Sequence, residues 1–312
     1  MPEVVEVKKY VDLIHKNVSS NILIDFNILN GRYKKHKKFD LFDQIKSILL
    51  LSLDKPLSLV KCSNKGKLIY FEFSYVMNKE KKTIYLINTL GLMGGWAFKL
   101  NDTNKFIHPK ILQYINNETI TNYLLGNMKH INVEFIFKHG TLYFYDMLSF
   151  GTLKFIDNYN EFIKKLNSIG PDIMDFSTTK EIFIERLSKY YKKNVGIVLL
   201  NQKIISGIGN YLRSDSLWLS KINPFRKIND LSKKELEKLF ESLKKITWGL
   251  YNKNKAIKLQ ILNENDIIPS TYKRDFFIYG NNTDIYNNKV IKEELYEGSQ
   301  KRFIYWCPAI QK

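Results

Sequence analysis

Hydrophobic and polar positions follow two different rhythms in the first half of the chain. Apolar residues at helical spacing predict an amphipathic helix over residues 3–17, and its stripe consists of Val7, Tyr10, Val11 and Ile14. From about residue 20 to 156, apolar and polar residues alternate instead, as they do in half-buried strands. The clearest runs cover 68–72, 83–90, 131–138 and 142–145. This half therefore predicts a two-layer β-sandwich with a leading helix.

Helical spacing returns after the turn-forming sequence Gly170-Pro171-Asp172. Ser232 and Glu235 have the spacing of a capping box at the start of one of these helices. The predicted helices cover residues 180–191, 195–200, 211–219 and 231–250.

The last part of the chain changes pattern again. Segment 276–306 is rich in aromatic and β-branched residues around the turn signal Gly280-Asn281-Asn282, which predicts a β-hairpin. The whole pattern indicates an α+β fold. Its parts are a β domain at 1–158, a linker at 159–175 and a mainly helical domain at 176–312.

A strong excess of positive charge narrows the choice of partner. The 312 residues include 49 Lys and Arg against 31 Asp and Glu, so the net charge is +18 and the pI is near 9.5. Such an excess favours a polyanionic partner, and nucleic acid and an acidic membrane surface both fit this description.

Hydropathy and cysteine content indicate a soluble, intracellular protein with no membrane partner. No apolar run approaches the roughly 18 residues that a membrane-spanning helix needs. Glu3 and Glu6 interrupt the region where a signal peptide would need an apolar core. Only Cys62 and Cys307 are present, which is too few for a disulfide framework.

Three separated segments carry candidate chemistry: Met1-Pro2-Glu3, Gly207-Ile208-Gly209-Asn210, and Arg302 near the end. Removal of Met1 would give Pro2 a secondary amine, and amines form imine-type covalent intermediates. Paired glycines allow tight turns whose N–H groups bind phosphate, and a guanidinium grips phosphate through two hydrogen bonds. Taken alone, the first segment also fits a plain helix start, and the glycines fit a turn between packed helices.

Two further features have weaker interpretations. The basic run 32–38 fits a solvated loop better than a phosphate-contacting rim or a localisation signal. The histidines show no spacing of metal ligands or of a catalytic triad, so we assign them no role. They are His15, His36, His108, His130 and His139.

Together these segments resemble the Fpg/Nei family of bifunctional DNA glycosylases, and the similarity runs from end to end. Residues 195–210 (VGIVLLNQKIISGIGN) resemble the family's helix-two-turns-helix element, expected at about 194–220. Residues 300–312 resemble the end of its finger, expected at about 275–312. Within the family, the chain is most similar to zincless-finger Nei-like enzymes, including those of giant viruses.

This resemblance implies catalytic roles for four residues. The Pro2 amine would attack the anomeric carbon and expel the damaged base, while Glu3 would handle protons at the sugar and the leaving group. Lys67 would supply positive field near the amine and contact the phosphate or the base, although alone it fits a solvated strand-end lysine. Arg302 would clamp the phosphates that flank an extruded nucleotide.

Supporting and DNA-binding roles follow from the same resemblance. Glu6 and Asp215 match carboxylates that buttress the amine, although either also fits a surface helix residue. Gly207 and Gly209 would form a phosphate cradle with N–H groups pointing outward, and the Asn210 side chain would add another donor.

Base extrusion leaves a hole that the family fills from two loops. Leu92 matches the wedge position and Phe150 matches the aromatic that supports the other side. Leu148 stands where the family has an arginine that reads the orphaned base. Leucine donates no hydrogen bond to a base edge, so we predict weak discrimination of the opposite base and good activity on single strands.

The finger departs from the commoner zinc-binding pattern. Only Cys307 stands where four ligands would be needed, and no histidine lies beyond His139. We therefore expect no metal and no other cofactor, with the hairpin held by packing. The packing residues would be Tyr279, Phe303, Tyr305 and Trp306.

These interpretations predict a monomeric base-excision-repair enzyme that acts on damaged DNA, single- or double-stranded, in the nucleus or another DNA-containing compartment. It would remove oxidised pyrimidines through a Pro2 Schiff base followed by β,δ-elimination. One alternative is an Fpg-like enzyme for oxidised purines, since lesion choice would depend on the segment between Leu250 and Phe276. A second alternative is a DNA-binding protein without chemistry.

Overall fold

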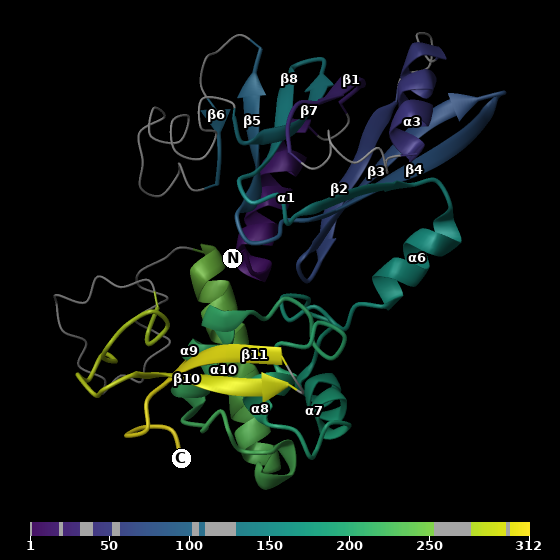
Figure 1. Ribbon diagram of the computed structural model, residues 1–312. Coiled ribbons are helices and arrows are strands. Elements are labelled where there is room, and N and C mark those ends of the chain that lie inside the picture. Colours follow the sequence, from purple (N-terminus) through teal and green to yellow (C-terminus); the bar gives the residue numbers. More distant parts are fainter. Residues whose placement is uncertain are drawn as a thin grey trace. The chain divides into compact units, whose positions relative to one another are not determined.

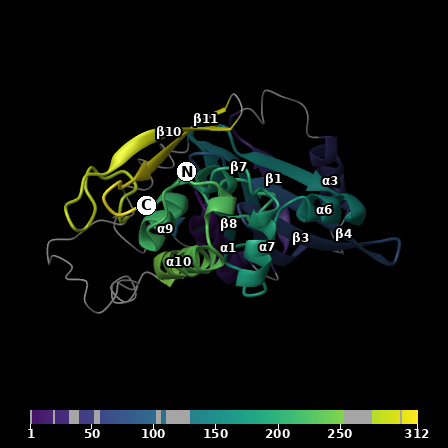
Figure 2. The same cartoon turned by 90° about the horizontal axis from the view of Figure 1, so that it is seen from below.

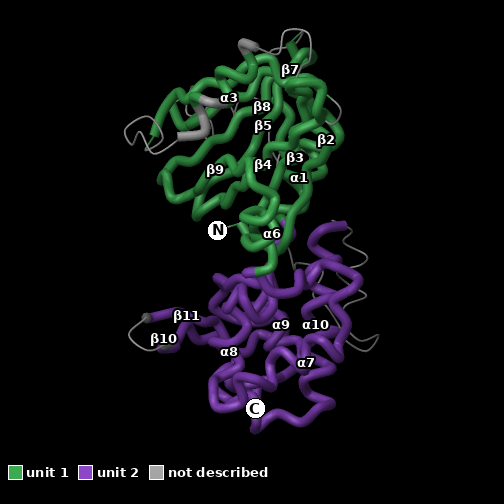
Figure 3. Tube along the Cα trace, turned by 90° about the vertical axis from the view of Figure 1, so that its right-hand side faces the viewer, with its two compact units in different colours: residues 1–2, 6–167 green, residues 3–5, 168–312 purple. Residues whose placement is uncertain are grey.

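The computed structural model describes residues 2–18, 21–31, 40–51, 57–101, 106–109, 129–252, 276–297 and 300–312. The chain divides into two compact units (Figure 3). The first contains residues 1–2 and 6–167, and the second contains residues 3–5 and 168–312. Strands dominate the first unit and helices the second (Figure 1), which confirms the predicted α+β class.

Two antiparallel sheets build the first unit. One has the strand order β1-β7-β8-β5-β6 and the other β2-β3-β4-β9. The strands of the first sheet are β1 (Leu23–Ile28), β5 (Gly94–Leu100), β6 (Phe106–Ile107), β7 (Ile131–Phe137) and β8 (Gly140–Asp146). Those of the second are β2 (Ser58–Lys65), β3 (Leu68–Met77), β4 (Glu80–Thr89) and β9 (Thr152–Ile156). Helices α1 (Val4–Val18), α3 (Asp40–Leu51) and α6 (Tyr159–Asn167) complete the secondary structure.

Both sheets contribute to one hydrophobic core, which makes the first unit a sandwich. Phe71 of β3 and Trp96 of β5 come from different sheets, and their ring centroids lie 5.3 Å apart. The indole Nε1 of Trp96 donates to the side-chain oxygen of Asn88 on β4 at 3.0 Å, so this buried donor is satisfied across the sheets. Helix α1 adds Tyr10 and Ile14 to the same core, as its helical spacing predicts.

Short helices and a terminal hairpin form the second unit. Its elements are α7 (Lys180–Ser188), α8 (Val195–Val198), α9 (Asn210–Ser220), the 3₁₀ helix η1 (Ile228–Asp230), α10 (Lys233–Asn252), β10 (Ile291–Glu297) and β11 (Gln300–Trp306). Helix α9 packs along α10 (Figure 2). The long helix α10 buries an apolar stripe that includes Leu236, Leu239 and Leu243.

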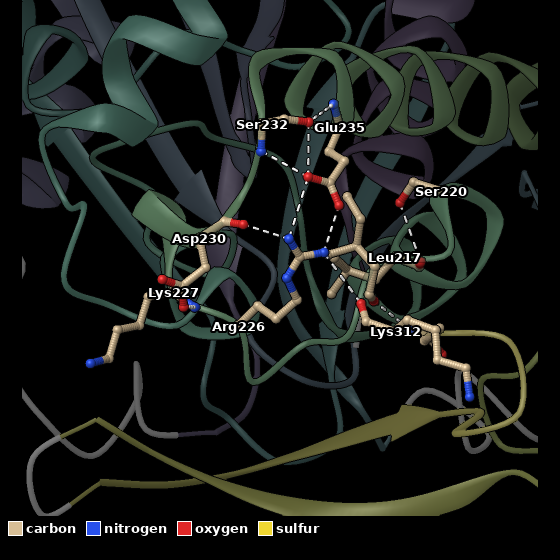
Figure 4. Close-up of polar contacts among 10 residues, drawn as sticks. Leu217, Ser220, Arg226, Lys227, Asp230, Ser232, Glu235 and Lys312 are labelled. Carbon is tan, nitrogen blue, oxygen red and sulfur yellow. Dashed lines mark hydrogen bonds and ion pairs between the residues drawn. The ribbon is translucent and has the colours of Figure 1, made fainter.

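The predicted capping box at the start of α10 is present. The backbone N–H of Ser232 donates to Glu235 at 2.7 Å, and the Glu235 N–H donates to the Ser232 hydroxyl at 3.2 Å. The guanidinium of Arg226 donates to the same carboxylate at 2.5 Å (Figure 4). These bonds, with that of Arg226 first, lower the pKa of Glu235 to about 2.

Several sequence predictions differ from the structure in detail. The hairpin exists, but it consists of β10 and β11; the chain does turn at Gly280, and this turn is not the one that joins the two strands. Segment 159–175 is structured, because 159–167 forms α6 of the first unit and 168–175 belongs to the second. Residues 32–39 and 253–275 lie outside the described residues, and so do the whole basic run and most of the segment assigned to lesion choice.

Within the described ranges, no helix has the length and apolar character required to cross a bilayer.

Candidate functional site

A buried carboxylate caps helix α9 from the other end of the sequence. Glu3 is 1% exposed, and its Oε1 accepts the Tyr211 N–H at 2.9 Å. Its Oε2 accepts the N–H groups of Gly209 at 2.7 Å and Leu212 at 3.3 Å. Helix α9 begins at Asn210, so Glu3 satisfies the exposed donors of its first turn and places negative charge at the positive end of the helix dipole.

Two glycines make room for this chain segment. A Cβ on Gly209 would lie 2.3 Å from Cδ of Glu3, so only glycine leaves space for the carboxylate. Gly207 has φ +98°, and a Cβ there would lie 2.8 Å from Cβ of Val4. The Val4 N–H donates to the Gly207 carbonyl at 3.1 Å. The Gly207-Gly209 turn is therefore a seat for residues 3 and 4.

This arrangement corrects the expected phosphate cradle. The N–H of Gly209 is bonded to Glu3, and the N–H of Gly207 donates to the Gln202 side chain at 2.9 Å. Neither group points outward, because both are needed to hold the turn and the carboxylate. Asn210 keeps donors instead, since within the described part of the chain no acceptor lies against its Nδ2 or its backbone N–H.

Arg213, which no sequence motif singles out, is completely buried and bonded to Asn210. Its Nη1 donates to the Gly196 carbonyl at 2.8 Å, and its Nη2 donates to Asn210 Oδ1 at 3.2 Å and to the Phe303 carbonyl at 2.5 Å. Burial lowers the pKa of Arg213 to about 10, the negative charge of Glu3 opposes this change, and the positive charge of Arg302 adds to it. The guanidinium therefore remains a cation at neutral pH.

Arg302 is exposed on β11, and the next residue along the strand is the one held by Arg213. The structure thus connects the start of α9 with the strand that carries Arg302. These contacts all lie in the second unit, which also contains Glu3.

Asp215 is buried at a different place in the second unit. Its carboxylate accepts the N–H groups of Phe277, Ile278 and Tyr279 at 2.9, 3.0 and 3.1 Å. These three bonds hold residues 277–279, which precede the terminal hairpin. The proposed role of Asp215 in supporting the amine stays a prediction.

The remaining catalytic candidates belong to the first unit. Pro2 is half-buried and directly precedes Glu3, and α1 begins two residues after it, at Val4. Lys67 is half-buried in the two-residue turn between β2 and β3, where Gly66 has φ +56°. Glu6 lies in the first turn of α1. The roles given to these residues stay predictions.

Two neighbouring loops of the first unit carry exposed apolar side chains. A Cβ on Gly91 would lie 2.6 Å from the Gly151 nitrogen and 2.7 Å from the Phe150 carbonyl carbon, so the loops touch. The Asp146 carboxylate accepts the Gly151 N–H at 2.6 Å and shapes the second loop. The exposed residues are Leu92 (41%), Met93 (38%), Leu148 (48%) and Phe150 (58%). Exposed apolar side chains gathered in this way are typical of a binding surface.

A carboxylate organises the chain before the terminal hairpin. Asp284 accepts the N–H groups of Tyr286 at 2.9 Å and Asn288 at 2.8 Å, and the indole of Trp218 at 3.3 Å. The buried Cys307 thiol lies 3.6 Å from the same carboxylate. In the portion of the chain that the structure describes, no group of three or more His, Cys, Asp or Glu side chains is arranged to hold a metal ion.

Comparison with known proteins identifies the class to which this arrangement belongs. The profile of the formamidopyrimidine-DNA glycosylase H2TH domain matches residues 169–250, which include Gly207, Gly209 and Asn210. The formamidopyrimidine-DNA glycosylase of Oceanobacillus iheyensis is 30% identical over 155 residues, which are 49% of this chain and 54% of the relative. That of Carboxydothermus hydrogenoformans is 30% identical over 187 residues, covering 59% and 65% respectively. The chain thus spans about half to two thirds of these relatives.

Solved structures share the fold over the whole chain. A complex between the Lactococcus lactis Fpg and abasic-site DNA has a TM-score of 0.68 at 22% identity, with 99% of both chains covered. A structure of MutM with DNA containing carbocyclic 8-oxo-G also has a TM-score of 0.68 at 22% identity and covers 100% of both chains. Residues 169–250 thus match an H2TH domain of the Fpg type, and the chain has the fold of the Fpg and MutM structures. Its place in a zincless-finger branch stays a prediction.

Proposed function

We propose that the protein is a bifunctional DNA glycosylase and abasic-site lyase of base excision repair. Its substrate is damaged DNA, and its preferred lesions are oxidised pyrimidines. The observation that carries this proposal is the seat of Glu3: the H2TH turn holds residues 3 and 4, with a carboxylate fixed one residue after Pro2, the proposed nucleophile. A protein that only binds DNA has no need for such a seat.

The proposed chemistry begins with the free amine of Pro2. Its nitrogen attacks the anomeric carbon, and the bond to the base breaks as the departing base takes up a proton. The bond from this carbon to the ring oxygen then opens to give the Schiff base, from which β- and δ-elimination release the two flanking phosphates. Glu3 is positioned by three backbone donors and serves as the carboxylate beside the reacting sugar. Lys67 supplies positive field that favours the unprotonated amine.

DNA binding is supported by charge and by exposed apolar loops. A net charge of +18 favours a polyanion. In the second unit, Arg302 and Asn210 supply hydrogen-bond donors for DNA phosphates. In the first unit, Leu92 and Phe150 supply side chains that fill the space left by an extruded base. A purine-derived lesion is the second candidate, because the curated relatives are formamidopyrimidine-DNA glycosylases.

Borohydride trapping tests the proposal. The native protein, with its N-terminus verified by mass spectrometry, is incubated with oligonucleotides that carry an abasic site, an oxidised pyrimidine or a formamidopyrimidine. We expect a covalent adduct on the peptide that contains Pro2, and loss of base excision in Glu3→Gln. A version with an uncleaved extension before Pro2 is the matched control, since its Pro2 nitrogen is an amide. Tight DNA binding without any adduct in the native protein would leave only a DNA-binding protein.

A further inference from the structure

We propose that Arg213 is a positioning residue that fixes two phosphate contacts, those of Asn210 and Arg302, relative to each other. This inference rests on the proposed function, because that function assigns both contacts to DNA. It extends the function by naming a side chain that touches no DNA yet determines how the protein grips it.

The argument starts from the three elements that meet at this guanidinium. Gly196 lies in α8, Asn210 begins α9 and Phe303 lies in β11, and each provides an oxygen to Arg213 at 2.5 to 3.2 Å. The planar fork of an arginine has donors in fixed directions, so these acceptors hold one another in place. One acceptor belongs to Asn210, a candidate for phosphate binding, and another belongs to Phe303, the residue after the second candidate, Arg302.

Stability alone does not explain a cation at this position. Arg213 is 0% exposed, and its Nε is buried without a hydrogen-bond partner in the described structure. A buried charge is expensive, and apolar side chains of similar volume are often as stabilising or better. What arginine provides here is a set of N–H donors in fixed directions, and such a set can align the groups that accept from it.

Asn210 is oriented by this bond. Its Oδ1 accepts from Arg213, so its Nδ2 is the end of the amide that remains to donate, and a phosphate needs a donor. On the other side, the bond to the Phe303 carbonyl fixes the strand immediately after Arg302. Arg213 thereby sets the spacing between one donor on α9 and one on β11.

A double-mutant cycle tests this coupling. Affinity is measured by fluorescence anisotropy for a short duplex that contains a tetrahydrofuran abasic analogue, for the native protein and for Arg213→Lys, which keeps the charge and loses the fork. We expect Arg213→Lys to weaken binding about tenfold, the effect of one charge-assisted hydrogen bond. We also expect Asn210→Ala and Arg302→Ala to weaken binding about tenfold in the native protein but less than threefold in Arg213→Lys.

Full losses for both alanine variants in the Arg213→Lys background would overturn the proposal, since a merely structural residue lowers stability without changing those losses. Arg226→Lys is the matched control, because it removes a hydrogen-bonded fork in the same unit that touches Glu235 and neither phosphate candidate (Figure 4). We expect its affinity to equal that of the native protein.

A second measurement leaves Arg213 intact and is decisive if Arg213→Lys does not fold. The Asn210→Ala and Arg302→Ala effects are combined in one protein, and a coupling of at least threefold supports the proposal, whereas additivity overturns it. Repeating this cycle on undamaged duplex, together with the borohydride experiment, separates the role of Arg213 in DNA binding from the proposed catalytic function. If the native protein forms no borohydride adduct yet shows the coupling, the catalytic function fails and the role of Arg213 in DNA binding stands.

Discussion

Gly209→Ala tests the link between the H2TH turn and the carboxylate of Glu3. The new Cβ would lie 2.3 Å from Cδ and 2.4 Å from Oε1 of Glu3, both far inside van der Waals contact. The backbone of Gly209 has φ −129° and ψ −154°, an extended conformation that alanine adopts. The steric conflict with Glu3 is therefore the main effect of the substitution.

The magnitude follows from the bonds that must break. Moving the carboxylate lengthens its bonds to Gly209 and Tyr211, which are now 2.7 and 2.9 Å long. Hydrogen bonds to a charged group contribute about 1.5–3 kcal/mol each, and partial replacement by water reduces the total loss to about 2–3 kcal/mol. A displacement of about 1 Å at a reacting group lowers a rate on the order of 100-fold.

Single-turnover base excision and thermal unfolding measure the two effects. We expect Gly209→Ala to excise an oxidised pyrimidine about 100-fold more slowly and to unfold about 5–10 °C lower. Gly280→Ala is the control, because φ there is +74° but no atom of the described residues lies within 4 Å of the new Cβ. It should lose about 1 kcal/mol of stability from backbone strain and keep its rate. Native excision and native stability in Gly209→Ala would refute the reasoning.

Three further outcomes are expected. Phe150→Ala should reduce excision from duplex DNA several-fold and spare single strands without lowering the unfolding temperature, because the side chain is 58% exposed; an equal loss on both substrates would contradict a wedge role. Leu148→Arg should make excision depend on the opposite base, measured across four duplexes that differ only there, whereas four equal rates would show that this loop does not read it. Glu235→Gln should flatten the pH dependence of unfolding: the folded-state pKa of Glu235 is lowered to about 2, so its contribution is complete above the unfolded value near 4.5 and is lost as pH falls towards 2. We expect a loss of about 1 kcal/mol at pH 7 after allowing for solvent screening, and no change in denaturant midpoint at pH 7 would contradict it.

Local signals in the sequence were sufficient for much of the fold. Ser232 and Glu235 are three residues apart, so their capping box forms within one turn and is visible in the sequence. The alternation of apolar and polar residues likewise predicted the sandwich. Successive side chains of a strand point to opposite faces of a sheet, so this alternation is visible within a short stretch of sequence. The segment around Gly280 could not be predicted from local signals. Asp215 and Asp284 accept backbone N–H groups on either side of Gly280, and the hairpin begins only at Ile291.

The candidate site depended on contacts that no local pattern contains. Glu3 and Gly209 are separated by 206 positions in the sequence, so no local pattern indicates that the glycine is needed to accommodate a carboxylate. The burial of Arg213 becomes visible only when the carbonyls of Gly196 and Phe303 are brought to it. The motifs proposed which segments of the chain carry the site, but the bonds of Glu3 and Arg213 required the structure.

Residues 3–5 fold with the second unit although they are synthesised first. During translation, the chain start cannot be seated until the Gly207-Gly209 turn and helix α9 have left the ribosome. A prematurely terminated chain that ends before residue 207 would contain the whole sandwich, but its Glu3 carboxylate would lack all three backbone donors. This order of synthesis means that incomplete products cannot seat Glu3, the residue on which the proposed chemistry depends.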